Sequence, residues 1–219
     1  MNFRSVKDFP LEGQHALLRA DLNLPLVQGV ITDEFRLKSI LPTLRHLRAQ
    51  RAKIVLISHW GRPAGKPDPR FSLSHIVSVL RRVAPDFRTI FCPDVMGGKA
   101  MEAISQGKTG DIILLENLRF HPGEEANDLD FTKNLAALGD VYVNNTLSTC
   151  HRAHASIVGL PSQMPGCAGL FLEEEIKALI QALSHPQKPL MAIIGGAKIS
   201  TKLGVVQHLL QRVDMLAIG

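Results

Sequence analysis

Short runs of apolar residues alternate along this chain with longer stretches in which apolar residues recur every three or four positions. The short runs predict β-strands at residues 15–19, 53–57, 89–92, 111–115, 141–143, 190–194 and 215–218. They are apolar nearly throughout and do not alternate with polar residues, which is typical of strands that are buried on both faces. The runs therefore indicate a parallel sheet with helices on both sides.

The longer stretches predict amphipathic helices over residues 37–47, 73–83, 172–183 and 203–213, each with one apolar stripe. Strands and helices that alternate in this way are typical of an α/β fold. The pattern predicts a doubly wound, Rossmann-like parallel-sheet domain of three layers, followed by the truncated start of a second α/β domain.

Prolines and glycines interrupt the pattern over residues 161–169, before the third predicted helix, and Ser184, Pro186 and Pro189 interrupt it again after that helix. We therefore predict a first domain over 1–170, an interdomain helix and linker over 171–187, and a new unit over 188–219. This last unit holds one strand, one helix and one strand, which is far below the size of a domain. We expect a chain that stops short of a complete second domain.

The composition is that of a globular protein: of 219 residues, 45% are apolar and 21% are charged. No apolar run reaches the roughly 18 residues needed to cross a bilayer, and the N-terminus lacks the apolar core of a signal peptide. The three cysteines, Cys92, Cys150 and Cys167, form no Cys-x-x-Cys pair. The composition argues against a disulfide scaffold and a cysteine zinc site, and it predicts a cytoplasmic protein with no membrane partner.

The net charge of +5 is distributed unevenly. Residues 1–110 carry 17 Lys and Arg against 9 Asp and Glu, whereas residues 111–219 carry 8 against 11. A basic half is typical of a nucleic-acid binder or of a protein with a small, highly anionic substrate. The arginines stand singly and the few aromatic residues show no stacking pattern. We therefore favour the small anion, and nucleic-acid binding stays as a weaker alternative.

Basic and amide side chains follow nearly every predicted strand, where ligands of open parallel sheets bind. These segments are Arg19–Pro25, Ser58–Pro63, Glu116–His121, Asn144–His154 and Gly195–Lys202. An isolated arginine is usually a solvated surface residue, but Arg62, Arg119 and Arg152 each follow an apolar strand beside a His or Asn. Guanidinium groups that converge on one crevice repel one another unless an anion lies among them, so we predict an anion site.

Four histidines lie in the same segments. His59 is interpreted as a functional residue that bonds a phosphate or moves a proton. His121 and His151 are equally well explained as structural residues that bond a carbonyl group. His151 and His154 have the spacing of a metal pair, but no Cys or acidic partner lies at ligand spacing, so no metal site is predicted.

The segment Gly195-Gly196-Ala197-Lys198 precedes a predicted helix whose N-cap is Ser200. Backbone amides at the positive start of a helix bind phosphate, and Lys198 and Lys202 lie four residues apart on one helix face. The segment is not a Walker A loop. A tight turn followed by two solvated lysines is the structural alternative.

Five segments, in this order and spacing, resemble phosphoglycerate kinase. They are Arg-Ala-Asp-Leu-Asn at 19–23, Ser-His-Trp-Gly-Arg-Pro at 58–63, Leu-Glu-Asn-Leu-Arg-Phe at 115–120, His-Arg-Ala-His-Ala-Ser at 151–156 and Gly-Gly-Ala-Lys at 195–198. The resemblance covers the family's N-terminal domain, its interdomain helix and the start of its nucleotide domain. It implies reversible transfer of the γ-phosphoryl group of ATP to the carboxylate of 3-phosphoglycerate, which gives 1,3-bisphosphoglycerate.

The resemblance also implies the residues that bind 3-phosphoglycerate. They are Asp21, Asn23, Arg36, His59, Arg62, Arg119 and Arg152. Asp21 and Asn23 are implied to hold the hydroxyl and carboxylate end of the substrate. His59 and the last three arginines are implied to hold its 3-phosphate.

The resemblance implies three catalytic residues: Arg36, which stabilises the moving phosphoryl group, and Lys198 and Lys202, which meet that group from the nucleotide side. It also implies that Gly196 and Lys202 bind the nucleotide. The implied cofactor is ATP or ADP with Mg²⁺, and its metal ligands are expected in the C-terminal half of the family. We therefore expect these 219 residues alone to be nearly inactive yet to keep the anion site. The full-length protein is expected to be a monomer that acts on a small molecule and binds no nucleic acid.

The chain departs from the family's pattern at residues 144–148. They are Asn-Asn-Thr-Leu-Ser where the family usually has Asn-Asp-Ala-Phe-Gly, which alters the loop leading to Arg152. This loop and the short chain support an alternative function, a non-catalytic phosphate-binding module derived from such a kinase.

Overall fold

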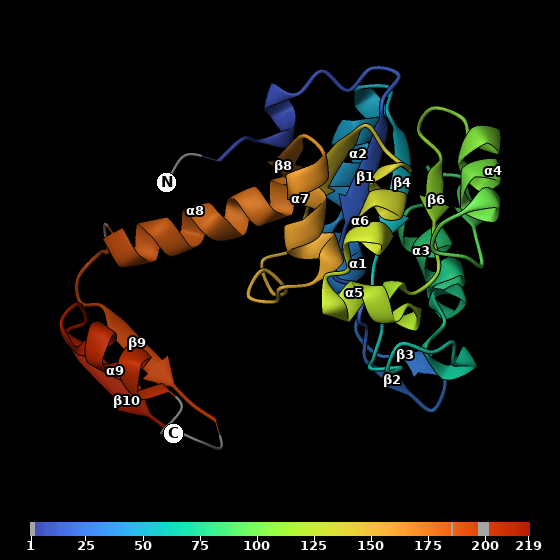
Figure 1. The fold of residues 1–219 in the computed structure, drawn as a ribbon. Helices are drawn as coiled ribbons and strands as arrows, with labels where there is room; N and C mark the ends of the chain where they lie inside the picture. Colours follow the sequence, from blue (N-terminus) through green and yellow to red (C-terminus); the bar gives the residue numbers. More distant parts are fainter. Residues whose placement is uncertain (1–2, 185, 197–201) are drawn as a thin grey trace. The chain divides into compact units, whose positions relative to one another are not determined.

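The computed structural model describes residues 3–184, 186–196 and 202–219. The chain divides into two compact units, Met1–Glu173 and Glu174–Gly219, and the border falls within helix α8 (Leu170–Ser184). Both units are drawn in Figure 1. The predicted domain limits at residues 170 and 188 stay a prediction.

A parallel sheet of six strands forms the centre of the first unit, in the order β5-β6-β4-β1-β7-β8. Its strands are β1 (His15–Arg19), β4 (Lys53–Ile57), β5 (Thr89–Phe91), β6 (Ile112–Leu114), β7 (Val141–Asn144) and β8 (Gly166–Ala168). Each pair of neighbouring strands is parallel. A short antiparallel hairpin of β2 (Leu26–Val27) and β3 (Val30–Ile31) follows β1.

Helices connect the strands and cover the sheet (Figure 1). The α-helices between strands are α1 (Phe35–Ser39), α2 (Leu41–Ala49), α3 (Val77–Val83), α4 (Gly98–Gln106), α5 (Pro122–Ala126), α6 (Leu129–Ala136) and α7 (Leu160–Gln163). Short 3₁₀ turns are η1 (Val6–Asp8), η2 (Pro69–Phe71), η3 (Leu73–Ile76) and η4 (Leu118–Phe120), and η5 (Ala155–Gly159) is a π-helix.

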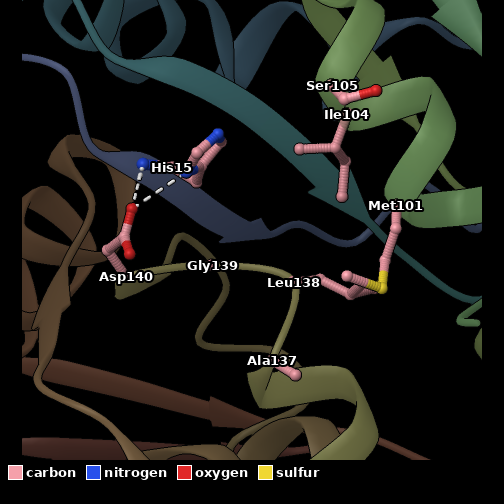
Figure 2. Close-up of a pocket in the computed structure, with 8 residues that line it drawn as sticks. All are labelled: His15, Met101, Ile104, Ser105, Ala137, Leu138, Gly139 and Asp140. Atoms are coloured by element: carbon pink, nitrogen blue, oxygen red, sulfur yellow. Dashed lines mark hydrogen bonds and ion pairs between the residues drawn. The ribbon is translucent and has the colours of Figure 1, made fainter.

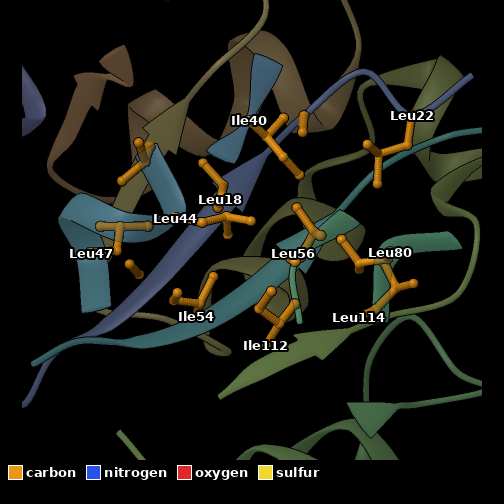
Figure 3. Packing of buried hydrophobic residues seen from close by; sticks show 14 of the residues in the cluster. Leu18, Leu22, Ile40, Leu44, Leu47, Ile54, Leu56, Leu80, Ile112 and Leu114 are labelled. Atoms are coloured by element: carbon orange, nitrogen blue, oxygen red, sulfur yellow. The ribbon is translucent and has the colours of Figure 1, made fainter. Parts of the chain in front are cut away.

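Successive residues of each strand point to opposite faces, which builds one hydrophobic core on each side of the sheet. Leu18 of β1 packs in a cluster with Leu44 of α2 and Leu80 of α3, as Figure 3 shows. Leu17, its neighbour, belongs to the other cluster, together with Leu135 of α6. The predicted doubly wound fold of three layers is thereby confirmed.

Several local predictions were wrong or incomplete. The predicted helix over 37–47 is two helices, because Pro42 in the first turn of α2 has no backbone N–H to continue the ladder from α1. The stretch 73–83 begins as the 3₁₀ turn η3 and becomes α-helical at Val77. Strand β8 lies in the stretch of prolines and glycines that predicts a break, since its Gly-Cys-Ala sequence carries no strand pattern of its own. Helices α4 to α7 were not predicted either.

The second unit holds strand β9 (Met191–Ile194), helix α9 (Leu203–Leu210) and strand β10 (Met215–Ile218). The two strands pair in parallel, as the predicted strand–helix–strand order requires. The predicted N-cap Ser200 lies outside the described residues. Of the helices in the described ranges, none combines the length and the apolar character that a bilayer crossing requires.

Candidate functional site

The carboxyl ends of β1, β4, β6 and β7 meet at one edge of the sheet, and the candidate residues follow these ends. Arg19, the last residue of β1, lies in register with Ile57 of β4 and Asn144 of β7. The chain passes from β1 to β4 on one side and, after β6, crosses to β7 on the other. Such a switch in strand order is where open α/β sheets bind ligands.

Arg19 and His59 form a buried pair at this edge. Arg19 is 1% exposed and donates from Nε to Oγ of Ser156 over 3.0 Å and from Nη1 to the carbonyl of Ala20. Its Nη2 lies 3.1 Å from Nδ1 of His59. Because a guanidinium only donates, Nδ1 must be the acceptor and the imidazole proton must lie on Nε2. His59 is therefore left with one N–H donor, at Nε2.

Burial lowers the pKa of His59 to about 2, and the charges of Arg19, Arg119 and Arg152 act in the same direction. The charges of Arg119 and Arg152 thus act on the same imidazole that Arg19 contacts. His59 is consequently neutral at physiological pH. A neutral N–H donor surrounded by cations is suited to bind an anion.

Arg119 is the middle residue of η4 and is 3% exposed. Its backbone N–H donates to Oδ1 of Asn117 over 3.0 Å, and its Nη1 donates to the carbonyl of Gly61 over 2.7 Å. Its Nε lies 3.1 Å from Oε1 of Glu125, in an ion pair that is not aligned as a hydrogen bond. Burial lowers the pKa of Arg119 and the Glu125 charge opposes this, but a guanidinium stays charged.

Three buried polar atoms beside this cluster make no hydrogen bond with the residues that the structure describes. They are Nε of Arg119, Nε of Arg152 and Oγ1 of Thr149. A buried donor left unpaired costs roughly 1–3 kcal/mol. An anion among these groups would accept from the guanidinium N–H groups, so the residues present fit an anionic ligand such as phosphate.

A second polar group lies just past β1. Oδ1 of Asp21 accepts from Nη1 of Arg36 over 2.9 Å, and the same nitrogen donates to the carbonyl of Asn23 over 2.8 Å. Oδ2 of Asp21 accepts from Oγ of Ser148 over 2.8 Å. The structure thus brings three of the predicted residues into direct contact, together with a serine that the sequence analysis did not select.

Gly61 links the two groups through its backbone. Its N–H donates to Oδ1 of Asn23 over 2.9 Å, and its carbonyl accepts from Nη1 of Arg119 over 2.7 Å. Its φ is 61°, and a Cβ here would overlap the ring of Phe71, so the position requires glycine. Arg62 follows directly and is exposed, with no hydrogen bond or ion pair to either group among the described residues.

Glu124 contacts the cluster through Ser156, and the sequence analysis did not select it. It is fully buried and accepts from the N–H and Oγ of Ser156 over 3.0 and 2.6 Å. Ser156 in turn accepts from Arg19, so a carboxylate is connected to the buried guanidinium through one hydroxyl. The available signal was the position of Ser156 at the end of the 151–156 segment. Nδ1 of His154 lies 3.8 Å from Oε1 of Glu124. Burial lowers the pKa of His154.

The side chains of the other two candidate histidines, His121 and His151, make no hydrogen bond or ion pair with the cluster in the part of the chain that the structure describes. His121 stacks on Phe131 with 4.9 Å between ring centres, and His151 is exposed. Within the described ranges, no three His, Cys, Asp or Glu side chains gather in a group that could hold a metal ion.

In the second unit, Nζ of Lys202 donates to the carbonyl of Gly195. Gly196 has a φ of 122°, and a Cβ there would lie 2.5 Å from this Nζ. Glycine therefore lets the ammonium group of Lys202 lie against the backbone. Lys198, the other predicted lysine, lies outside the described residues.

A pocket of about 230 Å³ lies at the opposite edge of the sheet (Figure 2). It is lined by His15 at the start of β1, by Met101 and Ile104 of α4, and by Leu138. Oδ2 of Asp140 accepts from the backbone N–H of His15 over 2.7 Å and lies 3.0 Å from its Nδ1. None of the predicted site residues lines this pocket.

Comparison with known proteins identifies the family to which the chain belongs. The family model described as "Phosphoglycerate kinase" matches residues 6–219. The chain belongs to the phosphoglycerate kinase family. This confirms the resemblance inferred from the five strand-end segments.

Curated phosphoglycerate kinases match the whole chain. The protein of Sinorhizobium medicae (strain WSM419) is 45% identical over 220 residues, and that of Chloroflexus aggregans is 45% identical over 221 residues. The chain covers 55% of each of these proteins, so it spans about half the length of the curated relatives it matches.

Solved phosphoglycerate kinases share the fold. The structure from Coxiella burnetii matches with a TM-score of 0.85 at 35% identity, over 100% of this chain and 55% of its own. The structure from Pyrococcus horikoshii OT3 matches with a TM-score of 0.87 at 32% identity, over 99% and 55%. The chain corresponds to the N-terminal part of such kinases.

Proposed function

We propose that this chain is the 3-phosphoglycerate-binding part of a phosphoglycerate kinase. The full protein would transfer the γ-phosphoryl group of ATP reversibly to the carboxylate of 3-phosphoglycerate. The observation that carries the proposal is that the buried Nε atoms of Arg119 and Arg152, close to the neutral His59, make no hydrogen bond within the described residues. The Glu125 carboxylate lies 3.1 Å from Nε of Arg119 but is not aligned as an acceptor. Family membership supports the same substrate.

The two polar groups suit the two ends of this substrate. The 3-phosphate would be held by Nε2–H of His59 and by Arg62, Arg119 and Arg152. Asp21 and Asn23 would hold the hydroxyl and carboxylate end. Because Gly61 joins the groups through both its N–H and its carbonyl, the spacing between the two ends is set by the backbone.

The reaction would depend on aligning the carboxylate with the phosphoryl group and on neutralising their charges, and less on proton transfer. The attacking carboxylate is already an anion, so it needs no general base. Arg36, fixed by Asp21 and by the carbonyl of Asn23, would neutralise the moving phosphoryl group. Holding two anions in line makes the reaction effectively unimolecular.

ATP with Mg²⁺ would supply the phosphoryl group, ADP with Mg²⁺ would accept it in the reverse direction, and the metal ion would lower the charge of the phosphates. In this chain we assign Gly196, Lys198 and Lys202 to the nucleotide side, supported by the close approach of Lys202 to the glycine turn. The metal ligands would belong to the half of the relatives that this chain does not match. On its own, the chain would therefore bind substrate without turnover.

We also propose a cytoplasmic protein that is monomeric at full length and has no nucleic-acid or membrane partner. Cys92 and Cys167 carry free thiols, and both are buried. Free buried thiols suit a reducing compartment.

Calorimetric titration of the chain with 3-phosphoglycerate tests substrate binding. We expect salt-sensitive binding that Arg119→Ala weakens by about tenfold or more, since it removes charge-assisted hydrogen bonds, and that Arg62→Ala also weakens. Arg88→Ala is the matched control, because Arg88 pairs with Asp111 outside the cluster. Equal affinity in all four proteins, or no binding by the unaltered chain, would overturn the proposal.

Activity belongs to a second experiment, on the full-length gene product. ATP-dependent consumption of 3-phosphoglycerate is expected above a blank reaction. Phosphate binding without any turnover would instead favour the alternative, a non-catalytic phosphate-binding module. The altered loop at 144–148 is the observation that favours this alternative.

A further inference from the structure

The loop after β7 is tied to Asp21 by a row of side-chain hydrogen bonds. Oδ1 of Asn144 accepts from the backbone N–H of Thr146 over 3.2 Å. Oγ1 of Thr146 lies 3.0 Å from Oγ of Ser148, and Ser148 lies 2.8 Å from Oδ2 of Asp21. These contacts join the loop to a residue 127 positions away in the sequence.

The carboxylate sets the direction of this row. An ionised carboxylate oxygen only accepts, so the single hydroxyl proton of Ser148 points to Asp21. Thr146 must then donate to Ser148. Thr146 is 3% exposed and the Asp21 side chain 11%, so the hydrogen bond between Thr146 and Ser148 is partly buried. Ser148 itself is exposed, and its hydrogen bond to Asp21 lies at the surface.

Ser148 holds the oxygen of Asp21 that the rest of the site leaves free. Oδ1 accepts from Arg36 over 2.9 Å and from the N–H of Asn23 over 3.1 Å. On Oδ2, the donor found among the described residues is Ser148. A carboxylate held at both oxygens resists rotation about its Cβ–Cγ bond, so the orientation of Arg36 on Oδ1 depends on Ser148 as well.

We propose that Ser148 is a positioning residue for the substrate hydroxyl and carboxylate end. It acts through Asp21 and does not touch the substrate itself. The proposal rests on the proposed function, since it takes Asp21 as the group that receives the substrate hydroxyl. It gives a role to a residue in the segment where this chain departs from its family's usual sequence.

Calorimetry of the whole chain with two probes separates this role from general damage. Ser148→Ala is expected to weaken 3-phosphoglycerate binding by about tenfold, because a hydrogen bond to a charged group is lost. Binding of inorganic phosphate, which needs only the His59 and Arg119 cluster, is expected to stay the same. Ser148→Thr keeps the hydroxyl and is expected to restore binding to within about twofold of the unaltered chain.

A double-mutant cycle tests that Ser148 acts through Asp21. In the Asp21→Asn background, Ser148→Ala is expected to cause little further loss of 3-phosphoglycerate binding, since the ionised acceptor is already gone. Unchanged 3-phosphoglycerate affinity in Ser148→Ala, or fully additive losses in the double variant, would overturn the positioning role alone. Phosphate binding without 3-phosphoglycerate binding in the unaltered chain would overturn the proposed function, and this proposal with it.

Discussion

Nη2 of Arg19 lies 3.1 Å from Nδ1 of His59, across the boundary between β1 and the loop after β4. The contact forces the imidazole proton onto Nε2 and places a neutral histidine among three arginines. The cluster thus holds one imidazole N–H and several guanidinium groups, and the Nε atoms of Arg119 and Arg152 make no hydrogen bond within the described residues. This is the electrostatic setting of an anion site.

The low pKa of His59 predicts loss of stability in acid. Its folded-state pKa of about 2 lies below the ordinary 6.5, so its contribution is complete above pH 6.5 and is lost as the pH falls toward 2. From about pH 7.5 to about pH 5 we expect this residue to remove about 2 kcal/mol from the free energy of unfolding. Urea denaturation at both pH values measures it.

His59→Gln provides the comparison, because glutamine does not titrate. This variant is expected to lose less stability between the two pH values, whereas His151→Gln, at an exposed position, should behave like the unaltered chain. His154, whose pKa burial also lowers, contributes to all three and cancels. An equal pH dependence in His59→Gln would contradict the prediction.

Removal of the Glu125 carboxylate should strengthen anion binding. Glu125 lies 3.1 Å from Nε of Arg119 and is 43% exposed, so it competes with a ligand for the guanidinium. We expect Glu125→Gln to raise the affinity for inorganic phosphate about two- to fivefold, the size expected of a partly exposed charge pair. Glu12→Gln is the control, because Glu12 pairs with Arg51 outside the cluster. Phosphate titrations that give the same or a weaker affinity for Glu125→Gln would count against the assignment of Arg119.

A side chain at position 61 should damage both stability and binding. Gly61 combines a φ of 61° with close contact to Phe71, so we expect Gly61→Ala to lower the free energy of unfolding by about 1–3 kcal/mol. It should also weaken 3-phosphoglycerate binding, because Asn23 and Arg119 both bond its backbone.

The control for this prediction is Gly98→Ala, in the first turn of α4, where a Cβ meets nothing within 4 Å. It is expected to leave binding unchanged and stability equal or slightly higher. Denaturation curves and calorimetry on both variants check the pair. Similar behaviour of the two variants would show that Gly61 has no special role.

The fold class was predictable because the strands of the sheet are buried on both faces. Leu17 and Leu18 are neighbours that enter different cores, and such runs carry a strong local signal. Strand β8 had no such signal, since Gly166–Ala168 is a strand through its pairing with β7 and the bridge between Ala168 and Ser5. Whether residues 166–168 form a strand depends on the neighbouring strand β7 and not on their own sequence.

The sequence by itself determined the parallel α/β architecture and the basic and amide residues that follow the strand ends. Only the tertiary structure decided their partners: Arg36 lies with Asp21, Arg119 lies with Gly61 and Glu125, and Arg62 is exposed. The support given by Arg19, Glu124 and Ser148 was likewise absent from the sequence pattern. Apolar periodicity is a local property of the chain, whereas the partner of a polar side chain is set by whichever distant segment the fold places within hydrogen-bond distance.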